Sequence, residues 1–323
     1  MRHIRKVFIL VGLAFLALKM SYAADAWPIK PIRFIVGFTA GGPSDIIARS
    51  IAQKMSVGLG QSIIIDNKPG AGGNLAAEYV AHSPADGYTW LLGNNSILAT
   101  NAALYKNLGF NPTQDFIPVG LVASQPNILV VNTALPVKNL KELIALAKQK
   151  PGQLNFASSG MGAAPHLSGE LFKTSANIQI VHIPYKGAQP ALVDLIAGHV
   201  NMMFATSASV IPFIKDRRVK PIAVTSLQRL KDFPQIPTMS ESGLPGFEMV
   251  SWHGIVVPSG VPDGIVQRID AELQVVQNNP ELLAAFKALG MTPSFSNSKE
   301  FSEYIKTEIP KWTKTVHDSG ATE

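Results

Sequence analysis

The chain has 323 residues, of which 46% are hydrophobic and none is cysteine. Its length allows one large or two medium hydrophobic cores, and without cysteine these cores, not disulfides, must stabilise the fold. The formal net charge is +6, but four of the 28 basic residues lie before position 20, and the remaining 24 nearly balance the 22 acidic residues. The composition therefore does not indicate a nucleic-acid-binding protein.

The N-terminus matches a secretory signal peptide. Arg2, Arg5 and Lys6 precede the apolar segment 7–18, and small residues lead to a cleavage site after Ala23. The apolar segment of about a dozen residues is shorter than the roughly 20 that cross a bilayer, and no cysteine follows the cut to carry a lipid. We therefore expect a mature, soluble protein in the periplasm of a Gram-negative cell.

Strand and helix signals then alternate along the chain. Strands alternating with helices indicate a mostly parallel sheet, in which ligands bind at the carboxyl ends of the strands. The first unit comprises, in order, a strand at 31–36, a glycine-rich turn at 37–45, a helix at 46–55, a strand at 62–66, a second glycine-rich turn at 67–74, a helix at 75–81 and a strand at 89–93.

A long run of β-forming residues at 116–131 predicts a strand that crosses into a second domain. The run 251–258 predicts the return crossing, and helices at 262–277, 280–289 and 299–316 then complete the first domain. Between the crossings the α/β pattern repeats, with helices predicted at 140–148, 166–173, 190–197 and 209–215 and strands at 154–157, 179–183, 202–205 and 221–225.

Two α/β units joined by two crossing strands predict a two-lobed fold that closes over a ligand. In fold class this is an α/β periplasmic-binding-protein fold of type II, with two Rossmann-like lobes. The predicted division is a signal peptide at 1–23, a discontinuous first lobe at 24–124 plus 252–323, and a second lobe at 125–251.

The glycine-rich turn before the first helix has the chemistry of an anion site. Glycine lets the backbone approach a ligand closely, and the first amides of the following helix lack intrahelical partners. The alternative is a plain connection between strand and helix. The candidate ligand-binding residues here are Phe38, Thr39, Ala40, Gly41, Gly42, Ser44 and Asp45.

Asp45 leaves two interpretations open. It could stabilise its own helix through the dipole, or it could face the cleft and hold an ammonium group.

The second lobe has a matching turn at 158–162, again between a strand and a helix. Two such turns that face each other could hold both ends of a dianion, whereas the alternative is two structural turns in similar domains. The candidate residues in this lobe are Ser158, Ser159, Gly160, Met161 and Gly162, together with Tyr185, Lys186 and Gly187 after a neighbouring strand.

Catalytic and cofactor motifs are incomplete. The hydrolase signature Gly-x-Ser-x-Gly is absent around Ser158 and Ser159, and the glycine patterns do not complete Gly-x-Gly-x-x-Gly. The histidines have no metal-binding spacing, and His166 fits a helix start or core position better than a general base. We expect no catalytic residue, no metal and no other cofactor.

Six motifs resemble the Bug family, the periplasmic receptors of tripartite tricarboxylate transporters. In the family's order they are WPxKPI at 27–32, AGGxxD at 40–45, DNKPGAGG at 66–73, SSGxGxxxHL at 158–167, HIPYKGxxPA at 182–191 and DLxxGxV at 194–200. Gly37 departs from the pattern, where proline is expected before the phenylalanine.

The resemblance implies a two-lobed receptor without catalysis, which binds small carboxylates chiefly through backbone amides and bridging waters. It implies contacts from residues 38–42, 158–162 and 185–187, and it adds Asn94, Ser96 and Thr206 as candidates at strand ends. The implied partners are a small carboxylate, such as a dicarboxylate, an aromatic acid or an acidic amino acid, and the membrane permease subunits. We expect a monomer that binds no nucleic acid.

Two other functions compete with uptake. One is an exported serine-type hydrolase that uses Ser159 with His166, although no acid is placed to orient the histidine. The other is a ligand receptor for a sensor or signalling system, which the sequence does not distinguish from uptake.

Overall fold

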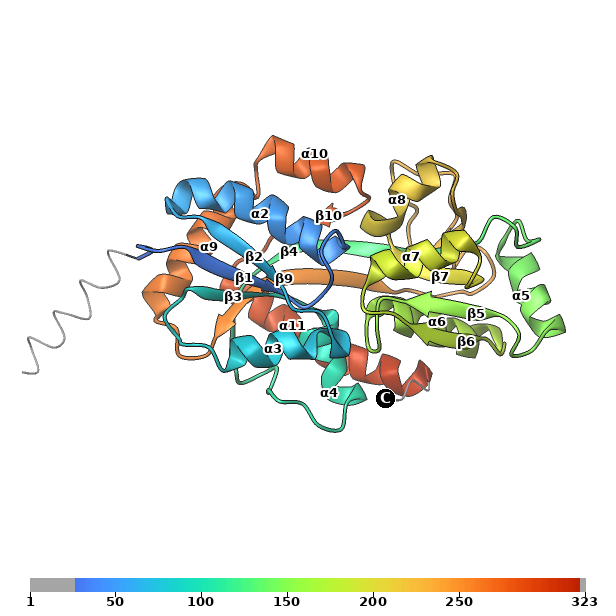
Figure 1. The fold of residues 1–323 in the computed structure, drawn as a ribbon, viewed down its shortest axis with the longest axis horizontal. Helices are drawn as coiled ribbons and strands as arrows, with labels where there is room; N and C mark the ends of the chain where they lie inside the picture. Colours follow the sequence, from blue (N-terminus) through green and yellow to red (C-terminus); the bar gives the residue numbers. More distant parts are fainter. Residues whose placement is uncertain (1–26, 320–323) are drawn as a thin grey trace, which may run out of the picture.

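The computed structural model describes residues 27–319, and the predicted signal peptide therefore lies outside the described residues. Figure 1 shows two α/β lobes, one at each end of an elongated molecule, with β4 and β9 running side by side between them. This arrangement confirms the predicted two-lobed α/β fold.

In the first lobe, β1 pairs in parallel with β2 on one side and β3 on the other. Apolar residues predominate in β1 and β3, and every residue of the two strands except Arg33 is buried. The elements are β1 (Ile32–Val36), α2 (Pro43–Leu59), β2 (Ile63–Asn67), η1 (Ala71–Gly73), α3 (Asn74–Ala81), β3 (Thr89–Asn94), the short π-helix η2 (Ser96–Thr100) and α4 (Asn101–Leu104).

Two strands connect the lobes. β4 (Phe116–Val131) and β9 (Val250–Pro258) are antiparallel, with pairs from Phe116 with Pro258 to Pro126 with Val250. β9 also pairs with β3, whereas the far end of β4 pairs with β7 and β8. The sheet order is therefore β2-β1-β3-β9-β4-β7-β5-β6, and the predicted crossing strands are confirmed.

The second lobe repeats the parallel arrangement, since β5 pairs in parallel with both β6 and β7. Its helices follow the strands as the sequence predicts. The elements are α5 (Leu140–Gln149), β5 (Asn155–Ser158), α6 (Ala164–Ala176), β6 (Val181–Pro184), α7 (Ala188–Ala197), β7 (Met202–Thr206), α8 (Ser207–Lys215) and β8 (Lys220–Val224).

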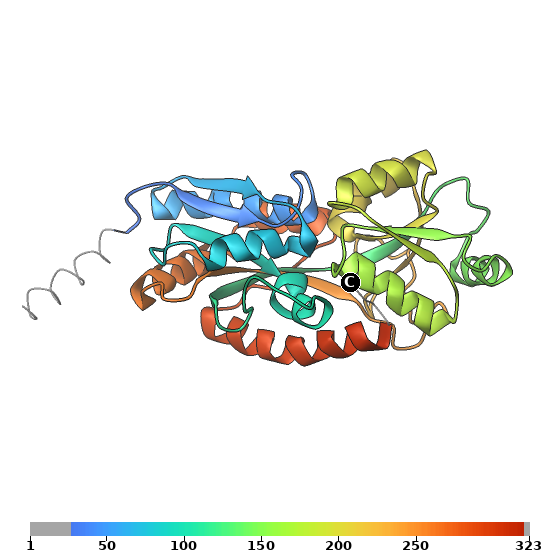
Figure 2. The ribbon, with the colours of Figure 1, turned by 60° about the horizontal axis from the view of Figure 1, so that its bottom comes forward.

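The C-terminal segment contributes mainly helices. It contains α9 (Asp263–Val276), α10 (Pro280–Ala288), β10 (Thr292–Pro293) and α11 (Ser298–Ser319). β10 pairs with β4, and α9 packs against α2. Figure 2 shows α11, in red, lying along the base of the molecule, where it contacts β4 and also α6 of the second lobe. The predicted boundary between the lobes remains a prediction.

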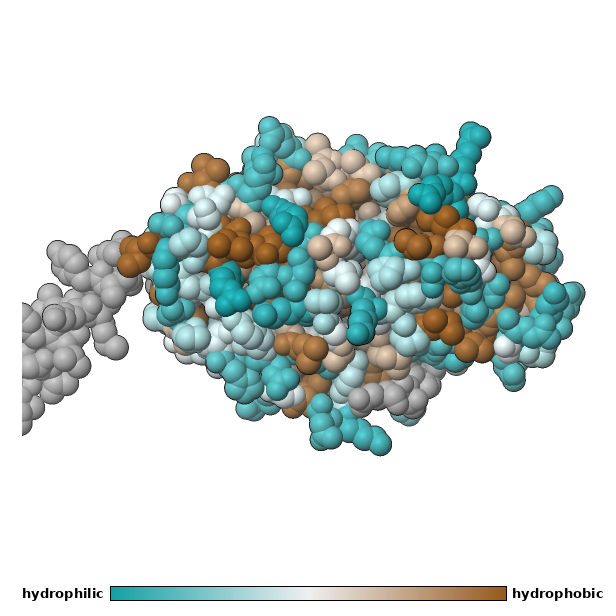
Figure 3. Space-filling model, in the orientation of Figure 1, coloured by the Kyte–Doolittle hydropathy of each residue, from teal (hydrophilic) through white to brown (hydrophobic). Residues whose placement is uncertain are grey.

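The hydrophobic core is continuous across the base of the two lobes. One cluster of buried side chains includes Leu91 from the first lobe, Phe156 and Phe172 from the second, and Trp252 and Trp312 from β9 and α11. Figure 3 shows that hydrophilic and hydrophobic residues are mixed over one face of the surface. Among the described residues, no helix combines the length and the apolar character that a membrane-spanning helix requires.

A buried carboxylate fixes α11 to the crossing strand. The indole nitrogens of Trp252 and Trp312 both donate to Glu308 Oε2, at 2.7 and 2.6 Å, and Glu308 is 4% exposed. Lys311 lies on the other oxygen, 3.3 Å from Oε1. These charge-assisted hydrogen bonds give both buried indole N–H groups an acceptor.

We predict that Glu308→Ala lowers the free energy of unfolding by roughly 2–4 kcal/mol, because it leaves two buried indole donors without an acceptor. Urea denaturation followed by circular dichroism measures this. Glu303→Ala on the same helix is the control, because its carboxylate is largely exposed and forms a surface ion pair with Lys306. Equal, small effects from both substitutions would contradict the assignment.

Candidate functional site

The first glycine-rich turn is shorter than predicted. α2 begins at Pro43 and not at 46, because proline is favoured in the first turn of a helix, where its missing N–H is not needed. Ser44 and Asp45 therefore belong to the helix. Gly41 adopts φ +74°, a left-handed conformation that favours glycine.

Close packing explains why residue 37 is a glycine. An added Cβ there would lie 2.9 Å from the Cα of Gly73. The absence of a side chain thus lets the first turn approach the second glycine-rich turn, at 67–74.

Four helices begin around the space between the lobes. Their N-caps, Gly42 of α2, Ala163 of α6, Gly187 of α7 and Thr206 of α8, make no side-chain capping hydrogen bond. α5 and α10 are capped by asparagine side chains, whereas α3 and α9, which do not line the inner hollow, also lack a side-chain cap. In the four helices around this space, the N-cap side chains therefore leave the first-turn amides unused, although in α8 the N–H of Ala208 donates to Oε1 of Gln125 at 3.3 Å. These amides carry the positive ends of the helix dipoles.

Residues at these helix ends line an inner hollow between the lobes. Its lining contains no Asp, Glu, Lys or Arg among the described residues, and burial lowers the pKa of His253 to about 4. The lining is thus neutral at pH 7. It consists of Phe38, Thr39, Gly42, Pro43, Ser44, Asn94, Asn95, Ser96, Ser159, Ala163, Ala164, Pro165, Ala188, Thr206, Ser251 and His253.

Eight predicted residues meet in the inner hollow. They come from both lobes and comprise Phe38, Thr39, Gly42, Ser44, Asn94, Ser96, Ser159 and Thr206. Four more, Gly160, Met161, Tyr185 and Lys186, line an outer hollow that also touches Phe38 and Ser159. The remaining predicted residues, Ala40, Gly41, Asp45, Ser158, Gly162 and Gly187, line neither hollow.

The sequence reasoning missed two kinds of lining residue. Pro43, Ala163 and Ala188 lie at the starts of helices that begin two or three residues before the predicted positions. A correct prediction of these helix starts would have identified them. Ser251 and His253 come from the crossing strand β9, where strand pairing sets His253 opposite Asn94. Ser251 pairs with Gln125 of β4. The register of β9 with β3 and β4 brings these side chains to the site, and no local motif predicts that register.

Asp45 supports its own loop. Its Oδ2 accepts hydrogen bonds from the backbone N–H of Gly41 at 2.9 Å and from Nε of Arg49 at 2.8 Å. Burial works to raise the pKa of Asp45, but the bonds from Arg49 and Gly41 outweigh it, and the pKa lies below its usual value. The helix-stabilising interpretation of Asp45 therefore has geometric support.

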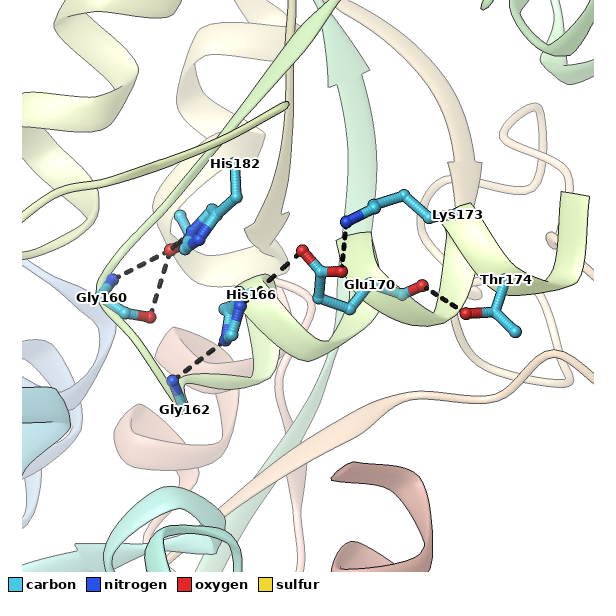
Figure 4. Close-up of polar contacts among 8 residues, drawn as sticks. Gly160, Gly162, His166, Glu170, Lys173, Thr174 and His182 are labelled. Atoms are coloured by element: carbon cyan, nitrogen blue, oxygen red, sulfur yellow. Dashed lines mark hydrogen bonds and ion pairs between the residues drawn. The ribbon is translucent and has the colours of Figure 1, made fainter. Parts of the chain in front are cut away.

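The glycine-rich turn of the second lobe, at 158–162, is held by two histidines. Ser158 is fully buried, and its Oγ lies 2.7 Å from Nε2 of His182 and 3.2 Å from the donating N–H of Gly160. The N–H of Gly162 donates to Nδ1 of His166 at 3.1 Å. Figure 4 shows His182 close to Gly160 and His166 close to Gly162, with Glu170 further along α6. These side chains hold the loop in place.

His166, Glu170 and His182 are close enough to be considered as a metal site, since their ligand atoms lie within 4.8 Å of one another. The geometry does not suit one. The two imidazole rings stack at 4.2 Å with an interplanar angle of 23°, so their in-plane lone pairs run nearly parallel and do not converge on one ion. Glu170 Oε2 is also paired with Lys173 at 2.6 Å.

Tyr185 is engaged by its own lobe. Its hydroxyl donates to Oδ2 of Asp194 at 2.6 Å, and burial together with this bond raises the pKa of Tyr185 to about 12. The phenol therefore braces the loop before α7. Lys186 beside it is exposed at the rim of the outer hollow.

The loops of the two lobes touch each other. Nε2 of Gln189 on α7 donates to the carbonyl oxygen of Gly41 at 2.9 Å. Gly187 lies so close to Thr39 that an added Cβ would be 2.1 Å from Oγ1 of Thr39. Across the outer hollow, a Cβ at Gly72 would lie 2.5 Å from the carbonyl oxygen of Met161. The lobes are thus closed over the inner hollow.

The fold and the neutral hollow, surrounded by helix N-termini, define a two-lobed solute-binding protein. A sequence profile described as tripartite tricarboxylate transporter family receptor matches residues 47–321. The chain belongs to this receptor family, which confirms the resemblance to the Bug proteins. The family consists of periplasmic binding proteins and is not a family of enzymes.

Three solved structures are similar to most of this chain. The R. palustris protein Rpa4515, solved with adipate, is 36% identical with a TM-score of 0.89, covering 92% of this chain and 99% of that one. The periplasmic binding protein BugD is 35% identical with a TM-score of 0.88 and the same coverage. MatC from Rhodopseudomonas palustris, with bound malate, is 30% identical with a TM-score of 0.85, covering 90% and 100%.

The buried histidines predict a pH-dependent stability. Burial, with help from nearby Lys173, lowers the pKa of His182 to about 4, and burial, His182 and Lys173 lower the pKa of His166 to about 3. In the unfolded chain both titrate near 6.5. Between about pH 4 and 6.5 the unfolded chain therefore binds more protons, and stability falls as the pH decreases.

We predict that His182→Gln reduces the loss of unfolding free energy between pH 7 and pH 4.5 by roughly 1–2 kcal/mol, because one titrating group is removed. Urea titrations at several pH values measure the slope independently of any change in absolute stability. His82→Gln at an exposed position is the control and should keep the wild-type slope. An unchanged slope in His182→Gln would contradict the prediction.

Proposed function

We propose that the protein is a periplasmic receptor that captures a small carboxylate between its lobes and delivers it to a tripartite tricarboxylate membrane transporter. The observation that carries this proposal is that the N-termini of four helices, α2, α6, α7 and α8, meet around one neutral hollow. Backbone amides at such ends bind anions without a cationic side chain. The similar proteins solved with adipate and malate both hold dicarboxylates.

The proposal includes export and assembly. The segment up to Ala23 is cleaved as a signal peptide, and the mature protein acts in the periplasm as a monomer that docks on the permease subunits. Its ligand is a dicarboxylate, an aromatic acid or an acidic amino acid. The closed lobes support this mechanism, because a receptor that delivers its ligand must alternate between closed and open states.

The hydrolase alternative lacks a suitable base. Nδ1 of His166 accepts the N–H of Gly162, and its Nε2 lies 3.9 Å from Glu170. Both ring nitrogens thus face groups other than Ser159, and no hydrogen bond joins Ser159 to a histidine among the described residues. The geometry favours binding over acyl transfer.

We predict that one or two members of a panel of small carboxylates raise the unfolding temperature. At a hundredfold excess over Kd a ligand adds about 2.7 kcal/mol of stability, which corresponds to roughly 5 °C for a chain of this size. Thermal shift in phosphate-free buffer identifies the ligand, and chromatography of the same samples checks for turnover. Formation of a product, or no shift with any acid, would contradict the receptor proposal.

Closure provides a second test. We predict that Gly187→Ala weakens binding of the best acid at least about tenfold, because the new Cβ would collide with Thr39 when the lobes close. Gly198→Ala, at the other end of α7, is the matched control. It has a left-handed φ of +85°, but the nearest atom to its Cβ is 3.6 Å away and belongs to Asn132.

Both glycine variants should lose stability, because alanine is strained at positive φ. Only Gly187→Ala should lose affinity in isothermal titration calorimetry. Wild-type affinity in this variant would show that approach of Thr39 to Gly187 is not part of ligand capture.

A further inference from the structure

The second lobe carries an excess of positive charge. The segment 125–251 contains 12 basic and 7 acidic residues, whereas the rest of the chain after residue 23 contains 12 basic and 15 acidic residues. Among the described residues, only two lysine or arginine side chains of this segment, Lys173 and Arg229, form an ion pair. Outside the segment, most basic side chains are paired with a carboxylate. The unpaired positive charge is therefore concentrated on one lobe.

Much of this charge lies at the end of the second lobe that is farthest from the first lobe. β4 runs from the first lobe into the second and ends at Val131, which pairs with Lys220 at the start of β8. The turn between α8 and β8 therefore lies at this end, and Figure 1 shows α5 there as well. We call this surface the basic end. Its exposed cations are Lys138, Lys141, Lys148, Lys150, Arg217 and Arg218.

Lys220 joins the two parts of the basic end. Its Nζ donates to the carbonyl oxygens of Leu135 and Val137, at 3.0 and 2.9 Å. These bonds place the turn before β8 beside the segment that leads into α5. Two acidic residues, Glu142 and Asp216, stand next to these cations in the sequence. Both carboxylate oxygens of Glu142 already accept hydrogen bonds at the start of α5, so the local charge is strongly positive.

Local stability does not explain all of these cations. Lys148 is in the last turn of α5, where it complements the helix dipole, but Lys141 is in the first turn, where a cation is unfavourable. Arg217 follows the C-cap of α8 with φ +57°, a left-handed conformation at a position where glycine is favoured. Lys141 and Arg217 thus occupy positions at which they lower stability, which indicates that their charge has another role.

The arrangement of the basic end fits a broad anionic surface. Its six cations come from two segments that lie across the end of the lobe, and none of them lines the inner or the outer hollow. A membrane with anionic phospholipids presents negative charge continuously over such an area, and each lysine or arginine that reaches it adds to the attraction. An acidic protein segment would be better matched by a groove that fixes its path.

We propose that the basic end binds the anionic phospholipid surface of a membrane. The contact is peripheral and electrostatic, and it goes beyond the proposed capture of a carboxylate. It leaves the binding site free, as β7 illustrates. Thr206 at the last position of β7 lines the inner hollow, whereas Met202 at the first position pairs with Val131 at the basic end. Because the basic end belongs to one lobe, the contact does not depend on whether the lobes are open or closed.

Co-sedimentation with lipid vesicles tests the proposal. The chain is used without its predicted signal peptide, because an apolar segment with flanking basic residues binds lipid directly. It should sediment with vesicles of phosphatidylcholine that contain about 40% phosphatidylglycerol, and not with phosphatidylcholine alone. Raising the salt concentration from about 20 mM to about 300 mM should weaken binding at least tenfold, because salt screens exposed charges.

Charge reversal locates the contact. Lys141→Glu combined with Arg218→Glu should weaken binding to the anionic vesicles at least about tenfold. The matched control combines Lys299→Glu with Lys306→Glu, two exposed positions on α11. It changes the net charge by the same amount but lies outside the second lobe, so it should weaken binding no more than about twofold.

Arg217→Gly separates the charge from the fold. It removes one cation and also relieves the left-handed φ, so stability in urea should be kept or raised while vesicle binding falls about threefold to fivefold. Should the double variant of the basic end fail to fold, this single variant still decides the outcome.

The possible failures are distinguishable. No sedimentation with anionic vesicles at low salt, or equal losses in the two double variants, would overturn the proposal. Binding to a polyglutamate peptide without binding to vesicles would also overturn it, and would assign the basic end to an acidic protein segment. The affinity for the best acid, measured by calorimetry, should be the same in all variants, so failure of the lipid proposal leaves the receptor function standing.

Discussion

The pairing of β4 with β9 is the constraint on which the rest of the structure depends. These two antiparallel strands are hydrogen-bonded to each other between the lobes, while β9 continues the first sheet and β4 continues the second. The connection between the lobes is therefore part of a sheet and not a loose linker. It also gives the binding hollow a fixed floor, because Ser251 and His253 project from β9.

The site shows how an anion can be bound without a cationic side chain. Lysine or arginine buried in an empty cleft would need a partner whenever the ligand is absent, because an isolated buried charge is costly. Helix N-termini avoid this problem. Their amides are neutral, fixed by the fold and already oriented toward the hollow, so little reorganisation is required when the carboxylate arrives.

Side chains behind the loops keep these amides in place. Asp45 and Arg49 brace the loop of the first lobe, and Ser158, His166 and His182 brace that of the second. None of these five residues lines the inner hollow. Asp45, Ser158 and His166 bond to the loop backbone, and Arg49 and His182 bond to the side chains of Asp45 and Ser158. Polar residues next to the candidate site thus divide into those that line it and those that fix its shape, and motif matching does not separate the two groups.

The sequence by itself determined the alternation of strands and helices, the two crossing strands and the family, since these depend on local periodicity, turn residues and motif order. It also located the turns at 37–45 and 158–162, because glycine patterns are local signals. Tertiary structure alone decided which neighbours of those turns face the hollow, that Ser158 lies beneath its loop, and that His253 reaches the floor. These features depend on strand register and lobe closure, which join residues far apart in the chain and leave no local pattern.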